Sequence, residues 1–186
     1  MPKTSQDVDP ERSNPGSTTR TPVPSAGRRG HLLAARIEQG AAQLLAFAEK
    51  LSDAEWRTPV SATDPRSVGV TVHHVASMYP LEIDLAQAVA SGKSVVDVTW
   101  EEVANVNAKH ARDNAQASKS AALELLRQNS QEAAAAVRAF SDEELDKAAP
   151  FSLNSCAPMT AQFVIEDHAM RHSWHHLAAI QKALRR

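Results

Sequence analysis

Residues 67–90 read SVGVTVHHVASMYPLEIDLAQAVA, and this stretch decides which fold the chain adopts. Its large apolar residues recur at the three- and four-residue intervals of an α-helix. Ser67 is a preferred type of N-cap residue, so the pattern predicts a helix over Val68–Ala90. Pro80 lies inside this helix and predicts a kink in the turn before it, because proline lacks the N–H that the helical hydrogen bonds need.

The same periodicity predicts three more long helices elsewhere in the chain. They lie over residues 29–51, over residues 99–140 with a break expected near 116–119, and over residues 158–184. Four long helices joined by loops of several residues predict an all-α fold, a four-helix bundle.

The segments between the long helices carry turn signals. Ser52–Glu55 and Ser141–Glu144 both read as Ser-x-x-Glu capping boxes, so each predicts a short capped turn. We expect Trp56 to close one end of the core. Pro150–Pro158 is predicted to be a loop.

The N-terminal segment differs in composition from everything that follows. Five of the ten prolines fall within its first 24 residues (Pro2, Pro10, Pro15, Pro22 and Pro24), among Ser, Thr, Arg and Asp. Such a segment buries too little apolar surface to offset the entropy lost on ordering. We therefore expect residues 1–29 to form a disordered tail and residues 30–186 to form one bundle domain.

Composition excludes several protein classes. The net charge of −2 gives no reason to expect nucleic acid or an anionic membrane as a partner. Cys156 is the only cysteine, which excludes an internal disulfide framework. No apolar run approaches the ~20 residues of a transmembrane helix, and the N-terminus lacks the apolar stretch of a secretory signal. We expect a cytoplasmic protein.

The functional prediction rests on the positions of the histidines. Four of the eight histidines lie between residues 168 and 176. His168, His172 and His176 are spaced i, i+4, i+8, which places neighbouring Cβ atoms about 5–6 Å apart on one helix face. Two imidazoles spaced in this way can bind one metal ion.

His73 and His74 are adjacent in the apolar helix over Val68–Ala90, and either can supply a third ligand. Burying an imidazole among apolar side chains is costly unless its nitrogens find partners. A metal ion provides such a partner. A carboxylate such as Asp167 or Glu82 would provide one without any metal.

Several segments resemble motifs of the DinB/YfiT-like superfamily. RSVGVTVHHVA (66–76) resembles its Trp-Ser-Val-x-Glu-x-x-x-His-Leu-Ala segment, and HSWHHLAAI (172–180) resembles its His-x-x-His-His-x-x-Gln-Ile signature. LSDAEW (51–56) and FSDEEL (140–145) are similar to its recurring Leu-Ser-Asp-Glu-Glu turns. The resemblance extends from about Leu32 to the C-terminus.

The resemblance implies an up-down-down-up bundle of the DinB/YfiT-like type and a divalent metal held by His74, His172 and His176. His168 is the substitute for His176 if the helix register differs. We interpret His73 and His175 as residues beside the ligands or at the surface.

The chain departs from the family pattern at three positions, because the family Trp, Glu and Gln are replaced by Arg66, Val70 and Ala179. These departures affect the expected substrate pocket more than the metal ligands.

Members of this superfamily include thiol S-transferases that use mycothiol or bacillithiol and a mycothiol-dependent maleylpyruvate isomerase. The resemblance implies an enzyme that uses a divalent ion, zinc or nickel, to activate a thiol or water. It would be a thiol S-transferase or a hydrolase of a small-molecule substrate, with a low-molecular-weight thiol as the co-substrate of the transferase. No catalytic side chain is assigned.

Two other functions fit the same residues. The first is a non-enzymatic bundle of a stress response that binds a metal or a small ligand. The second is a structural or interaction protein whose histidines pair with carboxylates. Ala-rich outer faces also make a homodimer a reasonable expectation.

Four more residues are candidates for weaker reasons. Cys156 precedes the last helix, whose N-terminus would lower a thiol pKa and make it a nucleophile or a soft ligand, although we favour the interpretation of a plain loop cysteine. Asp167 could orient a ligand imidazole or be a solvated acid. Asn105 and Asn107 reach the bundle mouth or remain at the surface.

Overall fold

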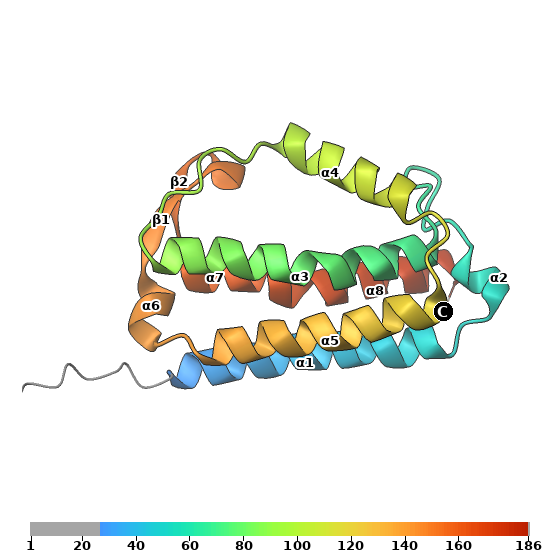
Figure 1. The fold of residues 1–186 in the computed structure, drawn as a ribbon, viewed down its shortest axis with the longest axis horizontal. Helices are drawn as coiled ribbons and strands as arrows, with labels where there is room; N and C mark the ends of the chain where they lie inside the picture. Colours follow the sequence, from blue (N-terminus) through green and yellow to red (C-terminus); the bar gives the residue numbers. More distant parts are fainter. Residues whose placement is uncertain (1–26, 186) are drawn as a thin grey trace, which may run out of the picture.

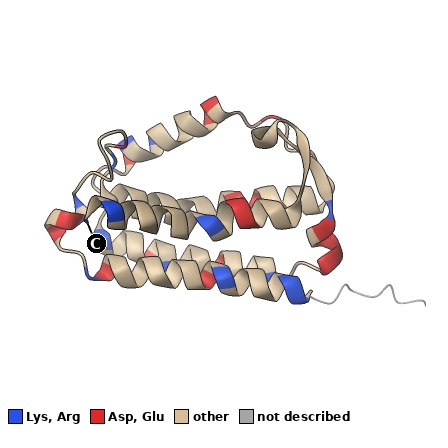
Figure 2. Cartoon of the chain, turned by 180° about the vertical axis from the view of Figure 1, so that it is seen from behind, with Lys and Arg blue, Asp and Glu red and all other residues tan. Residues whose placement is uncertain are grey.

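The structure is a computed structural model that describes residues 27–185. The predicted tail therefore lies outside the described residues, apart from its last three positions. Helix α1 (Arg28–Glu49) already includes the last two of these. The N–H of Gly27 donates to the carbonyl of Phe140 at 3.0 Å, and Arg29 pairs with Asp142 and with Asp146. Figure 2 shows the basic start of α1 beside the acidic turn that carries these two aspartates.

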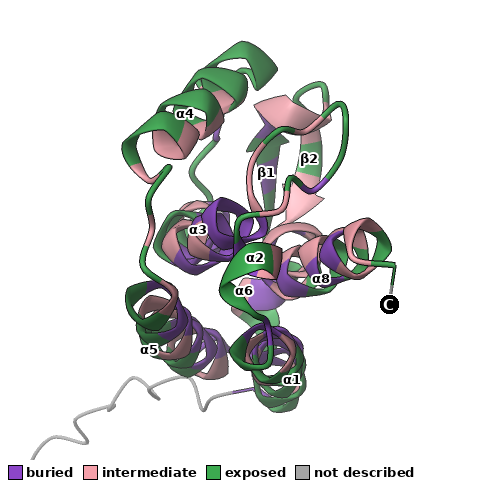
Figure 3. Ribbon diagram, turned by 90° about the vertical axis from the view of Figure 1, so that its right-hand side faces the viewer, coloured by how far each residue is buried: buried purple, intermediate pink, exposed green. Residues whose placement is uncertain are grey.

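Four long helical stretches form the bundle: α1, α3 (Val68–Ala90), α5 (Lys119–Arg138) and the C-terminal stretch of α7 (Ala161–Ile165), a π turn (Glu166–Met170) and α8 (Arg171–Ala183). Seen end-on, α1, α3, α5 and α8 stand at the corners, and their buried faces point inward (Figure 3). Helix α5 packs against both α1 and α3, and α8 closes the ring. The all-α, four-helix prediction is confirmed, and the predicted bounds of α3 match those observed.

The helix directions follow the expected up-down-down-up order. Helices α3 and α5 run the same way, opposite to α1 and α8 (Figure 1). Two parallel neighbours need a long connection to bring the chain back to the starting end. Helix α4 (Trp100–Asp113) makes this connection.

The single long helix predicted over residues 99–140 is corrected to two helices with different roles. Residues 114–118 separate α4 from α5, and Ser118 caps α5. The expected break is thus confirmed, but α4 leaves the bundle and lies outside α3 (Figures 1 and 3). None of its residues is buried. Periodicity predicts a helix without saying what the helix packs against.

The predicted Pro150–Pro158 loop is wrong in part, because a β-hairpin occupies this region. Strand β1 (Ala148–Phe151) pairs antiparallel with β2 (Ala157–Thr160) around a 3-10 turn (Ser152–Asn154), with Pro150 opposite Pro158. Prolines are tolerated here because the sheet has two strands among the described residues. On the outer side of β1, the carbonyl of Pro150 accepts from the N–H of Val95 at 2.9 Å, which needs no donor from the proline. Phe151 is fully buried and fixes the hairpin to the core.

Both short capped turns are confirmed. Helices α2 (Asp53–Trp56) and α6 (Asp142–Asp146) each begin with a complete capping box. Trp56 is buried, as expected, and its indole N–H donates to the carbonyl of Ala117 at 3.2 Å. A Cβ at Gly69 would lie 2.3 Å from this indole, so glycine is what allows the ring to lie against α3.

Helix α3 continues through Pro80 as one helix. A proline at this position leaves the carbonyl of Ala76 without its usual donor four residues later. The side-chain amide of Asn129 on α5 donates to that carbonyl at 2.8 Å. The inter-helix hydrogen bond thus replaces the one that Pro80 removes. Among the described helices, none is both long and apolar enough to cross a membrane.

Candidate metal centre

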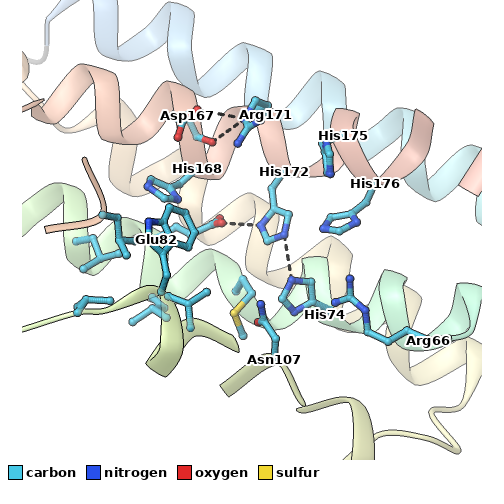
Figure 4. Close-up of a pocket in the computed structure, with 17 residues that line it drawn as sticks. Arg66, His74, Glu82, Asn107, Asp167, His168, Arg171, His172, His175 and His176 are labelled. Atoms are coloured by element: carbon cyan, nitrogen blue, oxygen red, sulfur yellow. Dashed lines mark hydrogen bonds and ion pairs between the residues drawn. The ribbon is translucent and has the colours of Figure 1, made fainter. Parts of the chain in front are cut away.

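Three histidines from two helices converge at the middle of the bundle wall. His74 comes from α3, and His172 and His176 come from successive turns of α8. One ring nitrogen of each lies within 4.8 Å of one ring nitrogen of each of the others. The ring centroids lie 4.8 to 5.5 Å apart, and Figure 4 shows the three rings turned toward one another. We call these residues the three-histidine cluster.

The spacing within the cluster suits a common metal ion. Nε2 of His74 lies 3.2 Å from Nε2 of His172. Two nitrogens bound about 2.0–2.1 Å from one tetrahedral zinc ion lie about 3.3 Å apart. The two imidazoles are thus already at the separation that a shared ion requires.

Glu82, two turns after His74 on α3, orients one member of the cluster. Its Oε1 lies 2.5 Å from Nδ1 of His172, and both side chains are largely buried. When Nδ1–H donates to the carboxylate, Nε2 keeps its lone pair and faces His74. Glu82 is one of the two carboxylates named as an alternative partner for the imidazoles. It satisfies His172 only, since no carboxylate among the described residues pairs with His74 or His176.

Burial keeps two members of the cluster, His74 and His176, uncharged. It lowers the pKa of His74 to about 2, and the neighbouring His172 adds to the effect. Burial, followed by His172, likewise lowers the pKa of His176 to about 2. A neutral imidazole offers the lone pair that a metal binds, whereas a protonated one does not.

His168 does not join the cluster, although the predicted spacing placed it on the same face. His168 lies inside the π turn over Glu166–Met170, which ends two residues before His172. A π turn takes one more residue than an α turn and so shifts the helix register. His168 instead lies against Phe151, with ring centroids 5.8 Å apart, and its Nε2 is buried without a partner among the described residues.

The other histidines lie outside the cluster. Nδ1 of His73 lies 2.9 Å from Nε2 of His110 on α4, which also contacts Ser77. This contact links α4 to α3 just beside His74, a role that the sequence did not indicate, because His110 stands alone on a polar helix. His175 is exposed, and so is His31 on α1.

The four remaining candidate residues differ in whether they lie at the pocket beside the cluster. Asn107 lines the pocket beside the cluster, whereas Asn105 is exposed and does not. Asp167 pairs with Arg171 at 3.2 Å and makes no hydrogen bond to a histidine among residues 27–185. Cys156 is exposed and lies outside this pocket.

The cluster opens into a pocket of about 300 Å³ enclosed by α3, α4, the hairpin and the C-terminal helix (Figure 4). Arg66, at the family tryptophan position, stands at one side next to His74 and is held by Asp64 at 2.7 and 2.8 Å. The opposite side is apolar. The pocket thus joins three nitrogen ligands to a space large enough for a small molecule.

Comparisons with known proteins agree with this description. The family model of the DinB superfamily matches residues 36–180. Among solved structures, the chain is similar to YfiT from Bacillus subtilis, described as "a probable metal-dependent hydrolase with an unusual four-helix bundle topology". The TM-score is 0.67 at 19% identity, over 93% of this chain and 92% of that chain, which shows a shared fold. The search of curated proteins gave no match.

Proposed function

The chain belongs to the DinB superfamily, and on that premise we propose that it is a metal-dependent enzyme acting on a small molecule. His74, His172 and His176 would hold one divalent ion, zinc or nickel. Imidazole ligands suit both ions, so the residues do not choose between them. Thiol S-transfer and hydrolysis are the two reactions proposed.

One observation carries this proposal: two buried imidazole nitrogens face each other at 3.2 Å while only one of the rings has a carboxylate partner. Carboxylate pairing alone would explain His172 and would leave His74 without one. Nδ1 of His74 is in fact buried without a hydrogen-bond partner among the described residues. A metal at Nε2 of both rings accounts for their approach.

Each residue would have a distinct task. Three imidazole ligands would leave coordination positions open, as in catalytic rather than structural zinc sites. A bound ion of this kind lowers the pKa of a thiol or water that it coordinates, which makes a nucleophile at neutral pH. Glu82 keeps the proton of His172 on Nδ1, and Asn107 and Arg66 offer hydrogen-bond donors at the pocket wall.

Metal content is the direct test. We expect wild-type protein, dialysed against zinc or nickel, to retain about one ion per chain. His172→Ala and His74→Ala should each abolish stoichiometric binding, whereas His31→Ala, on the exposed surface of α1, should leave it unchanged. Equal metal content in wild type and His172→Ala would refute the site.

The alternative is a non-enzymatic bundle that binds a metal or a small ligand. A turnover assay distinguishes the enzyme from the binding protein. The loaded protein is assayed for hydrolysis of simple esters and amides, and for transfer of low-molecular-weight thiols to electrophiles. Turnover lost in His172→Ala supports the enzyme. Stoichiometric metal without turnover in either assay favours the binding protein.

A further inference from the structure

The pocket beside the three-histidine cluster has one polar end and one apolar end. The apolar end is built from three separate elements: Met78 and Leu85 on α3, Val103 on α4, and Leu153 of the hairpin. Trp100, at the start of α4, extends it at the rim with 65% of its surface exposed. Apolar side chains brought together by three elements favour an apolar occupant over water.

Glu82 carries an unpartnered acceptor. Nδ1 of His74 and Nε2 of His168, two other lining residues, are likewise buried without a partner among the described residues. Glu82 is 6% exposed, and its Oε1 is taken by His172. Its Oε2 is buried and has no hydrogen-bond partner among residues 27–185, and Glu82 lines the same pocket. A buried carboxylate oxygen without a donor is costly, so it marks a point where a ligand donor would be favourable.

The other charged residues of the pocket already have partners of opposite charge. Arg66 is held by Asp64 through two hydrogen bonds, and Arg171 pairs with Asp167 at the rim. Glu82 is therefore the one charged residue of the lining that keeps a buried atom without a hydrogen-bond partner among the described residues.

We propose that the ligand of this pocket is a small amphiphile, with an apolar aliphatic or aromatic body at the α4–hairpin end and an N–H, O–H or S–H donor directed at Glu82. This inference rests on the proposed function, since it names the substrate class of the same site. A volume of about 300 Å³ lies at the lower end of the range for small-molecule pockets. It restricts the body to roughly two or three fused rings or a medium alkyl chain.

The first experiment needs no metal. Metal-free protein is titrated with 1-aminoanthracene, an apolar amine that fluoresces in apolar surroundings. We expect saturable binding at one site, weakened about fivefold by Val103→Asn because a polar amide replaces apolar surface in the pocket. Val106→Asn is the matched control, since Val106 lies on the same helix, is exposed and does not line the pocket. Absent binding, or equal loss in both variants, would overturn the apolar assignment.

The donor is tested by competition. 1-Naphthol and naphthalene have the same aromatic body, and only the former can donate to Glu82. We expect 1-naphthol to displace the probe at a concentration about fivefold lower, despite being the less hydrophobic of the two. Equal displacement would refute the assignment of a donor to Glu82.

Alkyl hydroxamates of increasing chain length then test the polar and the apolar end of the pocket together in zinc-loaded protein. The head group binds zinc, and each added methylene should tighten binding about fourfold until the apolar end is full. Affinity independent of chain length would overturn the proposal. The failures of the two proposals differ: a chain that binds 1-aminoanthracene but no zinc refutes the metal-dependent function alone, and a chain that binds zinc but not 1-aminoanthracene refutes the amphiphile alone.

Discussion

The Glu82–His172 contact offers the sharpest test of how the cluster is prepared for a metal. The perturbation is Glu82→Gln, in which the amide oxygen can still accept from Nδ1–H of His172 while the negative charge is lost. The contact is 2.5 Å long and joins side chains that are only 8% and 14% exposed. Because little solvent screens this contact, loss of the Glu82 charge should weaken metal binding by Nε2 of His172.

The expected loss of zinc affinity follows from the known effect of residues that orient metal-ligating histidines. Removing a group that orients a metal-ligating histidine typically weakens metal binding about 10- to 100-fold. We expect Glu82→Gln to lie near the lower limit, about tenfold or ~1.4 kcal/mol, because the ring orientation is kept. Glu82→Ala loses both charge and orientation, and should approach the upper limit.

The assay is zinc affinity by competition with a chromophoric chelator at neutral pH. Asp84→Asn is the matched control, because Asp84 is an exposed acid two residues further along α3. Circular dichroism of each variant establishes that the bundle is intact. Wild-type affinity in both Glu82 variants, or an equal loss in Asp84→Asn, would refute the argument that this hydrogen bond orients the ligand.

Three predictions concern the fold around the cluster. Gly69→Ala should lower the free energy of unfolding in urea by about 1–3 kcal/mol, because its Cβ would meet an indole ring at 2.3 Å; an unchanged midpoint would contradict the close approach. Asn129→Ala should cost about 1–3 kcal/mol by leaving the Ala76 carbonyl unpaired, and a double-mutant cycle should show a smaller loss in a Pro80→Ala background. In metal-free protein, the pKa of His74 is about 2 in the folded state and about 6.5 in the unfolded state. The contribution of neutral His74 to the free energy of unfolding is therefore complete above pH 6.5, and it is lost as the pH falls toward 2 because the unfolded state binds the proton first. Wild type should thus lose up to about 1.4 kcal/mol per pH unit more than His74→Gln below pH 6, and parallel stability curves for the two proteins would contradict the pKa shift.

Local signals in the sequence predicted much of the fold. The capping boxes at Ser52 and Ser141 depend on atoms three residues apart, and both formed as predicted. The bounds of α3 also matched, because its N-cap and its apolar spacing are local properties. The two departures, α4 outside the bundle and the hairpin at residues 148–160, concern the partners against which these segments pack.

The candidate site was predicted less completely. Motif resemblance selected His74, His172 and His176 before the structure brought them together. The i, i+4, i+8 spacing also suggested His168, but His168 lies in a π turn that shifts it out of register with the other two histidines of the C-terminal helix. A π turn depends on how the helix is held by its neighbours and leaves no periodic signature in five residues.

By itself, the sequence determined the all-α, four-helix class of the fold, the caps of its helices, and which imidazoles could reach one another along α8. These properties arise within a few residues, where backbone geometry fixes the distances. Only the tertiary structure decided that Glu82 meets His172 across 90 residues of chain, that its second oxygen stays unpaired, and that α4 and the hairpin enclose an apolar pocket. Such contacts depend on the packing of α3 against α8 and on the path of the crossover, and no local pattern encodes that relation.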